Sequence, residues 1–143
     1  MTALYVVAVG PVPPKPLEWI ETAAAEWFPL PVTRLPALPM PERAYDAARG
    51  QFHSVEIMKA VARAAPPNTT RILGVTEVDL AIPVLTFLFG QAQLDGPVAL
   101  VSLCRLRQEF YGLPPDEALL RERAAKETSG SPEMHEKPYP MGI

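Results

Sequence analysis

Hydrophobic residues near the start of the chain change from a continuous run to a helical spacing. The run LYVVAV at positions 4–9 is apolar at successive residues and ends at Gly10, which is typical of a strand buried on both faces. After a proline-rich turn at 11–16, apolar residues recur three or four positions apart, at Leu17, Ile20, Ala24, Trp27 and Phe28. This spacing predicts an amphipathic helix, which Pro29 ends.

The middle of the chain predicts a second helix and several strands. Residues 51–65 place apolar side chains on one helical face, namely Val55, Met58, Val61 and Ala62. Short runs rich in β-branched residues and leucine at 71–76, 85–89 and 98–103 are typical of strands. Residues 32–38 are a further strand candidate, at a sheet edge or in an irregular segment, because Pro36 lacks a backbone N–H.

Turn residues set the order of these elements. Asp95-Gly96 lies between the last two predicted strands and indicates a hairpin. Pro114-Pro115 followed by Asp116 and Glu117 predicts the start of a third helix, because proline fits the first turn and acids suit its positive end. Alternating strands and helices predict an α/β domain with a parallel or mixed sheet packed with helices. A length of 143 residues with 48% hydrophobic content is enough for one such domain.

Composition excludes two classes of partner. The 13 basic and 16 acidic residues give a net charge of -3, without the basic face that nucleic acids require. The apolar run at 80–90 has about half of the roughly 20 residues that a membrane span needs. The N-terminal residues 1–10 lack the positive charges of a signal peptide. We therefore expect a cytoplasmic protein that binds neither nucleic acid nor a membrane.

Few residues are available for metal or nucleophilic chemistry. A single cysteine, Cys104, excludes an internal disulfide and is expected to be buried in a strand. Of the two histidines, His53 is expected on the surface near the start of the second helix. The other belongs to the pair His135-Glu136, and a zinc-binding helix would need a second histidine where Tyr139 stands. The sequence contains no nucleophile elbow, phosphate-binding loop or CxxC pair.

Charged residues in the middle of the chain are predicted to have structural roles. Three carboxylates beside predicted turns are expected to cap backbone N–H groups or face solvent: Asp46, Glu77 and Asp79. Arg105 and Arg107 follow a predicted strand, and with Glu109 nearby we expect surface ion pairs there.

An ordered set of motifs in the middle of the chain points to a family. The segment RILGVTEVDL at 71–80 is followed by Phe87-x-Phe89-Gly90, then by VSL at 101–103 and EFYG at 109–112. This order resembles the archaemetzincins, a family of zinc-dependent metallopeptidases. The resemblance covers residues 1–127 and implies a metzincin-like α/β fold with a mixed sheet packed with helices.

The zinc motif that the resemblance implies does not follow. The family is expected to bind catalytic zinc through HExxHxxGxxH on a helix, and residues 119–127 look like the first turns of that helix. Taking Lys126-Glu127 as the residues before the motif, its five positions fall on Gly130, Ser131, Met134, Lys137 and Pro140. No position matches, and no cysteine follows Cys104 to form the family's second zinc site.

These departures define the expected organisation of the chain. We expect an archaemetzincin-like domain at 1–127 that is truncated before the zinc-binding motif and lacks the C-terminal subdomain. An unrelated irregular tail is expected at 128–143. A reading-frame change, a deletion or a natural end near codon 128 would each give such a shift in composition. We predict no catalytic residue, no metal-binding residue and no cofactor in this chain, although the family uses zinc.

Two functional hypotheses follow, with a third kept beside them. The first is an aminopeptidase-like scaffold, or pseudoenzyme, that does not hydrolyse peptides. Its missing helix and subdomain would expose apolar sheet surface and favour self-association. The second is a non-catalytic peptide-binding module, and the third is an active peptidase that uses an unseen site.

The peptide-binding hypothesis names a strand. By resemblance, 85–93 forms the rim of the cleft and adds a substrate strand to its open edge. The residues expected near the substrate are Phe87, Phe89, Gly90, Gln91 and Ala92. The alternative is that both phenylalanines fill the core and that Gly90 permits a β-bulge.

Overall fold

The structure, a computed structural model, describes residues 3–93 and 95–129 around a central five-stranded sheet. In spatial order the strands are β2 (Val32–Arg34), β1 (Ala3–Ala8), β5 (Thr69–Thr76), β9 (Val98–Ser102) and β8 (Gly90–Ala92). The first four are parallel to one another, and β8 is antiparallel to β9. The predicted α/β fold with a mixed sheet is therefore confirmed.

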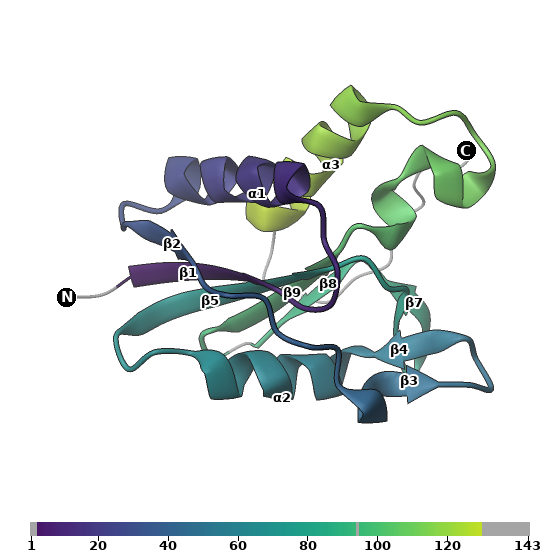
Figure 1. Ribbon diagram of the computed structural model, residues 1–143, viewed down its shortest axis with the longest axis horizontal. Coiled ribbons are helices and arrows are strands. Elements are labelled where there is room, and N and C mark those ends of the chain that lie inside the picture. Colours follow the sequence, from purple (N-terminus) through teal and green to yellow (C-terminus); the bar gives the residue numbers. More distant parts are fainter. Residues whose placement is uncertain (1–2, 94, 130–143) are drawn as a thin grey trace.

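Helices cover both faces of this sheet. The first and third helices, α1 (Pro14–Trp27) and α3 (Glu117–Ser129), lie on one face, and α2 (Ser54–Ala64) lies on the other (Figure 1). Parallel strands need long crossover connections, which place helices on the sheet faces. Strand β1 accordingly buries Val6 beneath α1 and α3 and Val7 on the α2 side, as its continuous apolar run predicts.

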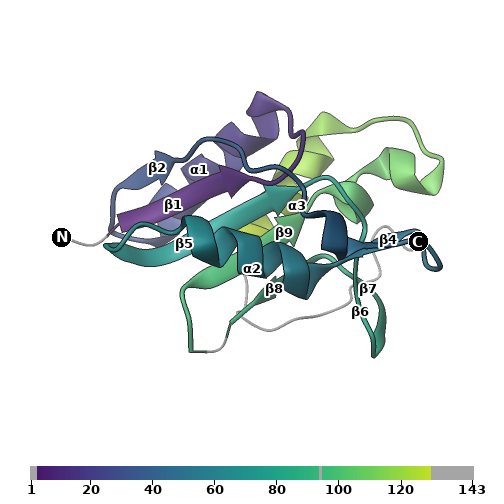
Figure 2. The same ribbon diagram turned by 60° about the horizontal axis from the view of Figure 1, so that its bottom comes forward.

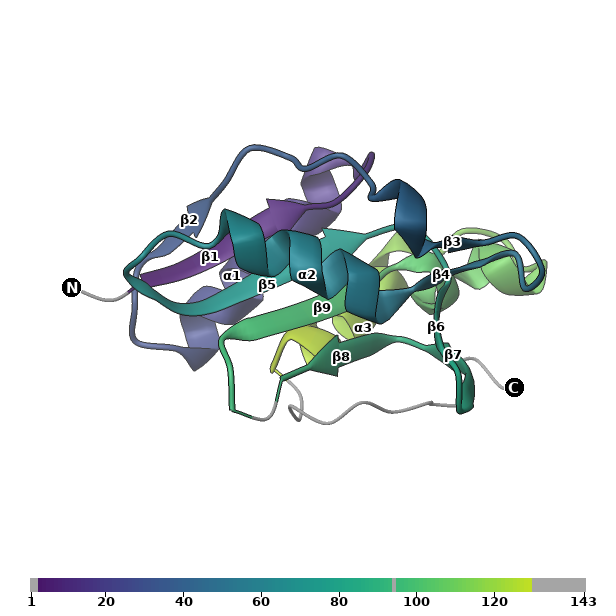
Figure 3. The same cartoon turned by 90° about the horizontal axis from the view of Figure 1, so that it is seen from below.

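A second, smaller sheet has the order β3-β4-β6-β7 and lies beyond the start of α2 (Figure 2 and Figure 3). Its strands are β3 (Tyr45–Asp46), β4 (Gln51–His53), β6 (Leu80–Ile82) and β7 (Leu85–Leu88). Short 3-10 helices are η1 (Glu42–Ala44), η2 (Cys104–Leu106) and η3 (Gln108–Tyr111). Strand β7 runs directly into β8, so one segment passes from the small sheet to the edge of the large one.

Several predicted boundaries and faces are wrong. Residues 51–53 form β4 instead of the first turn of α2, because Phe52 and His53 pair with β6. On α2, Val55 is 45% exposed and Ile57 is buried in its place. On α1, Trp27 is 64% exposed, since the buried face ends at Ala24.

The ends of two other elements also differ from prediction. The candidate strand at 32–38 is shortened to β2, with a further bridge between Val9 and Leu38. Helix α3 starts where the proline pair predicts and continues to Ser129, two residues into the expected irregular tail. The proposed tail beyond it, including His135-Glu136 and the five expected motif positions, lies outside the described residues.

Gly74 of β5 sets how closely α2 packs on the sheet. A Cβ atom at this position would lie 2.9 Å from Cγ2 of Val61 on α2 and 3.2 Å from Cδ1 of Leu100 on β9. Both neighbours are buried, so neither can move into solvent. The close approach of helix and sheet therefore depends on the missing side chain.

Gly74→Ala is expected to lower the free energy of unfolding by about 1–3 kcal/mol, because the added methyl group overpacks the interface. The check is urea denaturation of the single variants Gly74→Ala and Val61→Ala and of the double variant. Val61→Ala removes the closest contact, so the double variant should cost at least about 0.5 kcal/mol less than the sum of the singles. Additive costs would show that Val61 is not the limiting neighbour.

Candidate functional site

Among the residues that the structure describes, strand β8 is the last strand on its side of the large sheet. Phe89 O accepts a hydrogen bond from Ser102 N at 2.8 Å, and Gln93 N donates to Val98 O at 3.0 Å. Gln91 stands opposite Leu100 between these two pairs. In an antiparallel ladder, hydrogen-bonded residues alternate with residues whose backbone groups point outward. The N–H and C=O groups of Gly90 and Ala92 therefore face away from β9.

The side chains predicted for this rim have different surroundings. Phe89 is fully buried and fills the core below α1 and α3. Phe87 is half-buried and meets Phe89 edge to face, with ring centroids 5.3 Å apart. The Gln91 side chain accepts a hydrogen bond from the Ser54 hydroxyl at the start of α2. The rim thus offers backbone groups at Gly90 and Ala92, whereas Phe89 and Gln91 serve its attachment.

Gly90 is required for close approach and not for a bulge. Residues 90–92 pair with 99–101 in unbroken register. A Cβ atom at Gly90 would lie 2.6 Å from the carbonyl oxygen of Leu100, a backbone atom that cannot move aside. The bulge interpretation is therefore wrong, and the glycine lets β8 lie tightly against β9.

A charged cluster beside the rim joins the loop after β5 to the loop after β9. Arg105 donates to both carboxylate oxygens of Asp79, at 2.7 and 2.9 Å. The guanidinium carbon lies 4.0 Å from the ring centroid of Phe87 and 4.6 Å from that of Phe110. Burial disfavours the charge on Arg105, but the hydrogen bonds and attraction of Asp79 outweigh it and raise the pKa of the guanidinium.

A second arginine pair lies next to the first. Both side-chain carboxylate oxygens of Glu77 accept hydrogen bonds from Arg107. The side chains of Glu77 and Arg107 are each 25% exposed. The prediction of surface pairs with Glu109 and of solvated Glu77 and Asp79 is therefore wrong. Parallel pairing aligns Thr76 with Ser102, which brings residues 26 to 30 positions apart into contact.

The cluster extends to the hairpin that leads into β8. Gln51 donates from its side-chain amide to Asp79 Oδ2 at 3.0 Å and to the carbonyl oxygen of Thr86 at 2.9 Å. The side chain of Arg49 donates to the carbonyl oxygens of Ile82, Leu85 and Thr86. These contacts fix the β6–β7 hairpin and thereby the direction in which β8 enters the large sheet.

Asp46 caps a turn, as predicted, and also binds a histidine. Its Oδ1 accepts hydrogen bonds from the backbone N–H groups of Ala48 and Arg49. Its Oδ2 lies 3.0 Å from Nε2 of His53, whose side chain is 32% exposed and thus not fully on the surface. Desolvation acts to raise the pKa of Asp46, but the Arg49 N–H bond and His53 outweigh it, so the pKa is lowered.

The donors in the described part of the chain do not fit a zinc site. His53 is held by Asp46, and Asp79 and Glu77 each hold an arginine. Cys104 is half-buried at the start of η2, whereas a position in a strand was predicted. Burial of its thiol, followed by the negative charge of Asp79, raises the pKa of the thiol to about 11. Within residues 3–93 and 95–129, no three His, Cys, Asp or Glu side chains converge for a metal ion.

No helix in the described part of the chain combines the length and apolar character needed to cross a bilayer.

The sequence of this chain is similar to the sequences of archaemetzincins. No protein-family model matches the chain. It is 45% identical over 109 residues to the archaemetzincin of Methanocaldococcus jannaschii, covering 76% of this chain and 56% of that protein. It is 36% identical to the archaemetzincin of Pyrococcus furiosus, covering 98% of this chain and 73% of that protein. The chain thus spans about half to three quarters of the length of these relatives.

Solved structures agree with the sequence relatives. A zinc-dependent peptidase from Methanocorpusculum labreanum superposes with a TM-score of 0.77 at 25% identity, over 89% of this chain and 77% of that chain. The archaemetzincin of Methanopyrus kandleri gives a TM-score of 0.72 at 30% identity, over 89% of this chain and 69% of that chain.

Asp79→Asn is expected to lower the free energy of unfolding by about 1.5–3 kcal/mol, because it leaves the half-buried Arg105 without its charge partner. Urea denaturation provides the measurement. The matched control is Glu56→Gln, which removes the exposed pair with Lys59 and should cost less than about 0.5 kcal/mol. Equal costs for the two variants would contradict a structural role for the Asp79 cluster.

Proposed function

The chain belongs to the archaemetzincin family, and from this premise we propose that these 143 residues form an archaemetzincin scaffold that does not hydrolyse peptides. Hydrolysis by a zinc peptidase requires three metal ligands and a general base. In this sequence the four positions expected for them hold Gly130, Ser131, Met134 and Pro140, and Lys137 stands at the position of the motif's glycine.

One observation carries this proposal. His53, Asp79 and Glu77, three potential donors that the structure describes, already have other partners. Burial, then Asp79, raises the pKa of the Cys104 thiol to about 11, which makes the deprotonation that zinc binding requires more costly. Recruiting these groups to a metal would break contacts that hold the small sheet and the loops after β5 and β9 in place.

Elemental analysis after dialysis against a weak chelator tests this proposal. Less than about 0.1 equivalent of zinc is expected to remain, because a three-ligand protein site would retain its metal. Fluorogenic aminopeptidase substrates should stay uncleaved when zinc is added back. The zinc-dependent peptidase of Methanocorpusculum labreanum, treated in parallel, is the positive control for zinc retention. Retention of about one equivalent by this chain would overturn the proposal.

A second candidate function is peptide binding without cleavage, and the geometry of β8 favours it. The outward N–H and C=O groups of Gly90 and Ala92 can pair with an added extended peptide, which is the usual mode of β-strand addition. The flanking segment is anchored from both sides by Ser54 and the Asp79 cluster. A rigid edge lowers the entropy that binding would otherwise cost. Self-association through apolar sheet surface stays a prediction.

Ala92→Pro provides the test, because proline removes an outward N–H while leaving the ladder bonds of Gln91 and Gln93 intact. The probe is an acetylated, amidated pentapeptide that alternates threonine and valine. We expect its binding to weaken by at least about tenfold, measured by amide chemical shifts of β8. Ala92→Ser keeps the N–H and is the matched control. Equal affinity of the two variants would exclude the edge as the binding surface.

A further inference from the structure

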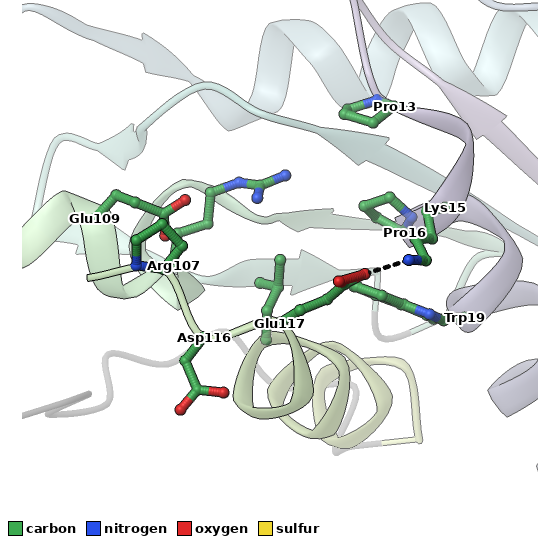
Figure 4. A pocket seen from close by; sticks show the side chains of 10 residues that line it. Pro13, Lys15, Pro16, Trp19, Arg107, Glu109, Asp116 and Glu117 are labelled. Carbon is green, nitrogen blue, oxygen red and sulfur yellow. Dashed lines mark ion pairs between the residues drawn. The ribbon is translucent and has the colours of Figure 1, made fainter. Parts of the chain in front are cut away.

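A surface pocket of about 280 Å³ lies between the start of α1 and the start of α3 (Figure 4). Its apolar lining consists of Trp19 and Leu120 together with three prolines, Pro13, Pro16 and Pro115. Its volume is close to the lower end of small-molecule sites, about 300 Å³. No residue of β8 lines the pocket, so it is separate from the proposed peptide edge.

The pocket lies at the carboxyl ends of the parallel strands. Pro13 follows β1, and Arg107 and Glu109 follow β9. Strands β2 and β5 flank β1 on opposite sides, with α1 and α2 on opposite faces of the sheet. In open α/β sheets, ligands bind in the crevice outside the carboxyl ends where the winding direction changes. The pocket thus lies at the end of the sheet where ligands bind in such folds, next to the loop that follows β1.

Charges of both signs surround the apolar lining. Lys15 on α1 and Glu117 on α3 form an ion pair at 2.6 Å, beside Trp19 (Figure 4). Their side chains are 66% and 56% exposed, and an ion pair this exposed contributes little stability. Glu109 lines the opposite side. A ligand with its own positive and negative ends could therefore replace the Lys15–Glu117 contact with two charged hydrogen bonds.

We propose that this pocket binds a free α-amino acid with an aliphatic side chain. The ligand carboxylate pairs with Lys15, and its ammonium group pairs with Glu117. The aliphatic side chain packs on Trp19 and Leu120. A carboxylate or an amine alone can pair with only one of these two side chains, so the pocket prefers the zwitterion to either half.

Fluorescence of Trp19 tests this proposal directly. The chain has two tryptophans, and Trp27→Phe leaves Trp19 as the single reporter; Trp27 is 64% exposed, so the replacement is tolerated. The probes are L-leucine, L-leucinamide and 4-methylpentanoate. L-leucine is expected to give a saturable change in emission and to bind at least about tenfold more tightly than the other two.

Charge-removing variants in the Trp27→Phe background separate the two contacts. Lys15→Gln and Glu117→Gln should each weaken L-leucine binding by about tenfold. Lys59→Gln, which removes a cation exposed on α2, is the control and should leave binding unchanged. The proposal is overturned if L-leucine gives no saturable change, if the three probes bind alike, or if the Lys15 and Glu117 variants bind as the control does.

Discussion

Parallel pairing of β1, β5 and β9 places the carboxyl ends of three strands that are distant in sequence side by side at one end of the sheet. The register aligns Val7 with Gly74 and Gly74 with Leu100, so the strands end side by side. Two hydroxyl groups stabilise this end of the sheet. Thr76 donates a hydrogen bond to the carbonyl oxygen of Val9, and Ser102 donates one to that of Val78. The arginine–carboxylate pairs and the pocket beside α1 both depend on this alignment.

Chemistry and scaffold have separate physical requirements in this molecule. The scaffold needs buried apolar strands, helices on both faces and a glycine at the β8–β9 contact. Zinc chemistry needs a few deprotonated donors at fixed positions, and these contribute almost nothing to the burial of apolar surface. A chain can therefore retain the family fold over nine tenths of its length, as the superpositions show, while Asp46 caps a turn and Glu77 and Asp79 form ion pairs.

Sequence patterns predicted the elements that are long enough to show a hydrophobic pattern. The run at 4–9 and the spacing from Leu17 to Ala24 identify β1 and α1 because each buries a continuous face. Strands of two or three residues, such as β3 and β4, are too short to show a period and were missed. The Arg105–Asp79 pair was missed because it depends on register between strands, which local spacing does not contain. An ordered set of motifs, in contrast, identified the family.

The chain crosses from one sheet to the other at Phe89. Residues 85–88 pair with β6 and residues 90–92 pair with β9, with the fully buried Phe89 between them. The small sheet cannot open without pulling on the last strand of the large sheet and on the core below α1 and α3. Locally unfolding segments usually coincide with units that share few buried contacts with their neighbours. The two sheets are therefore expected to open together, as one cooperative unit.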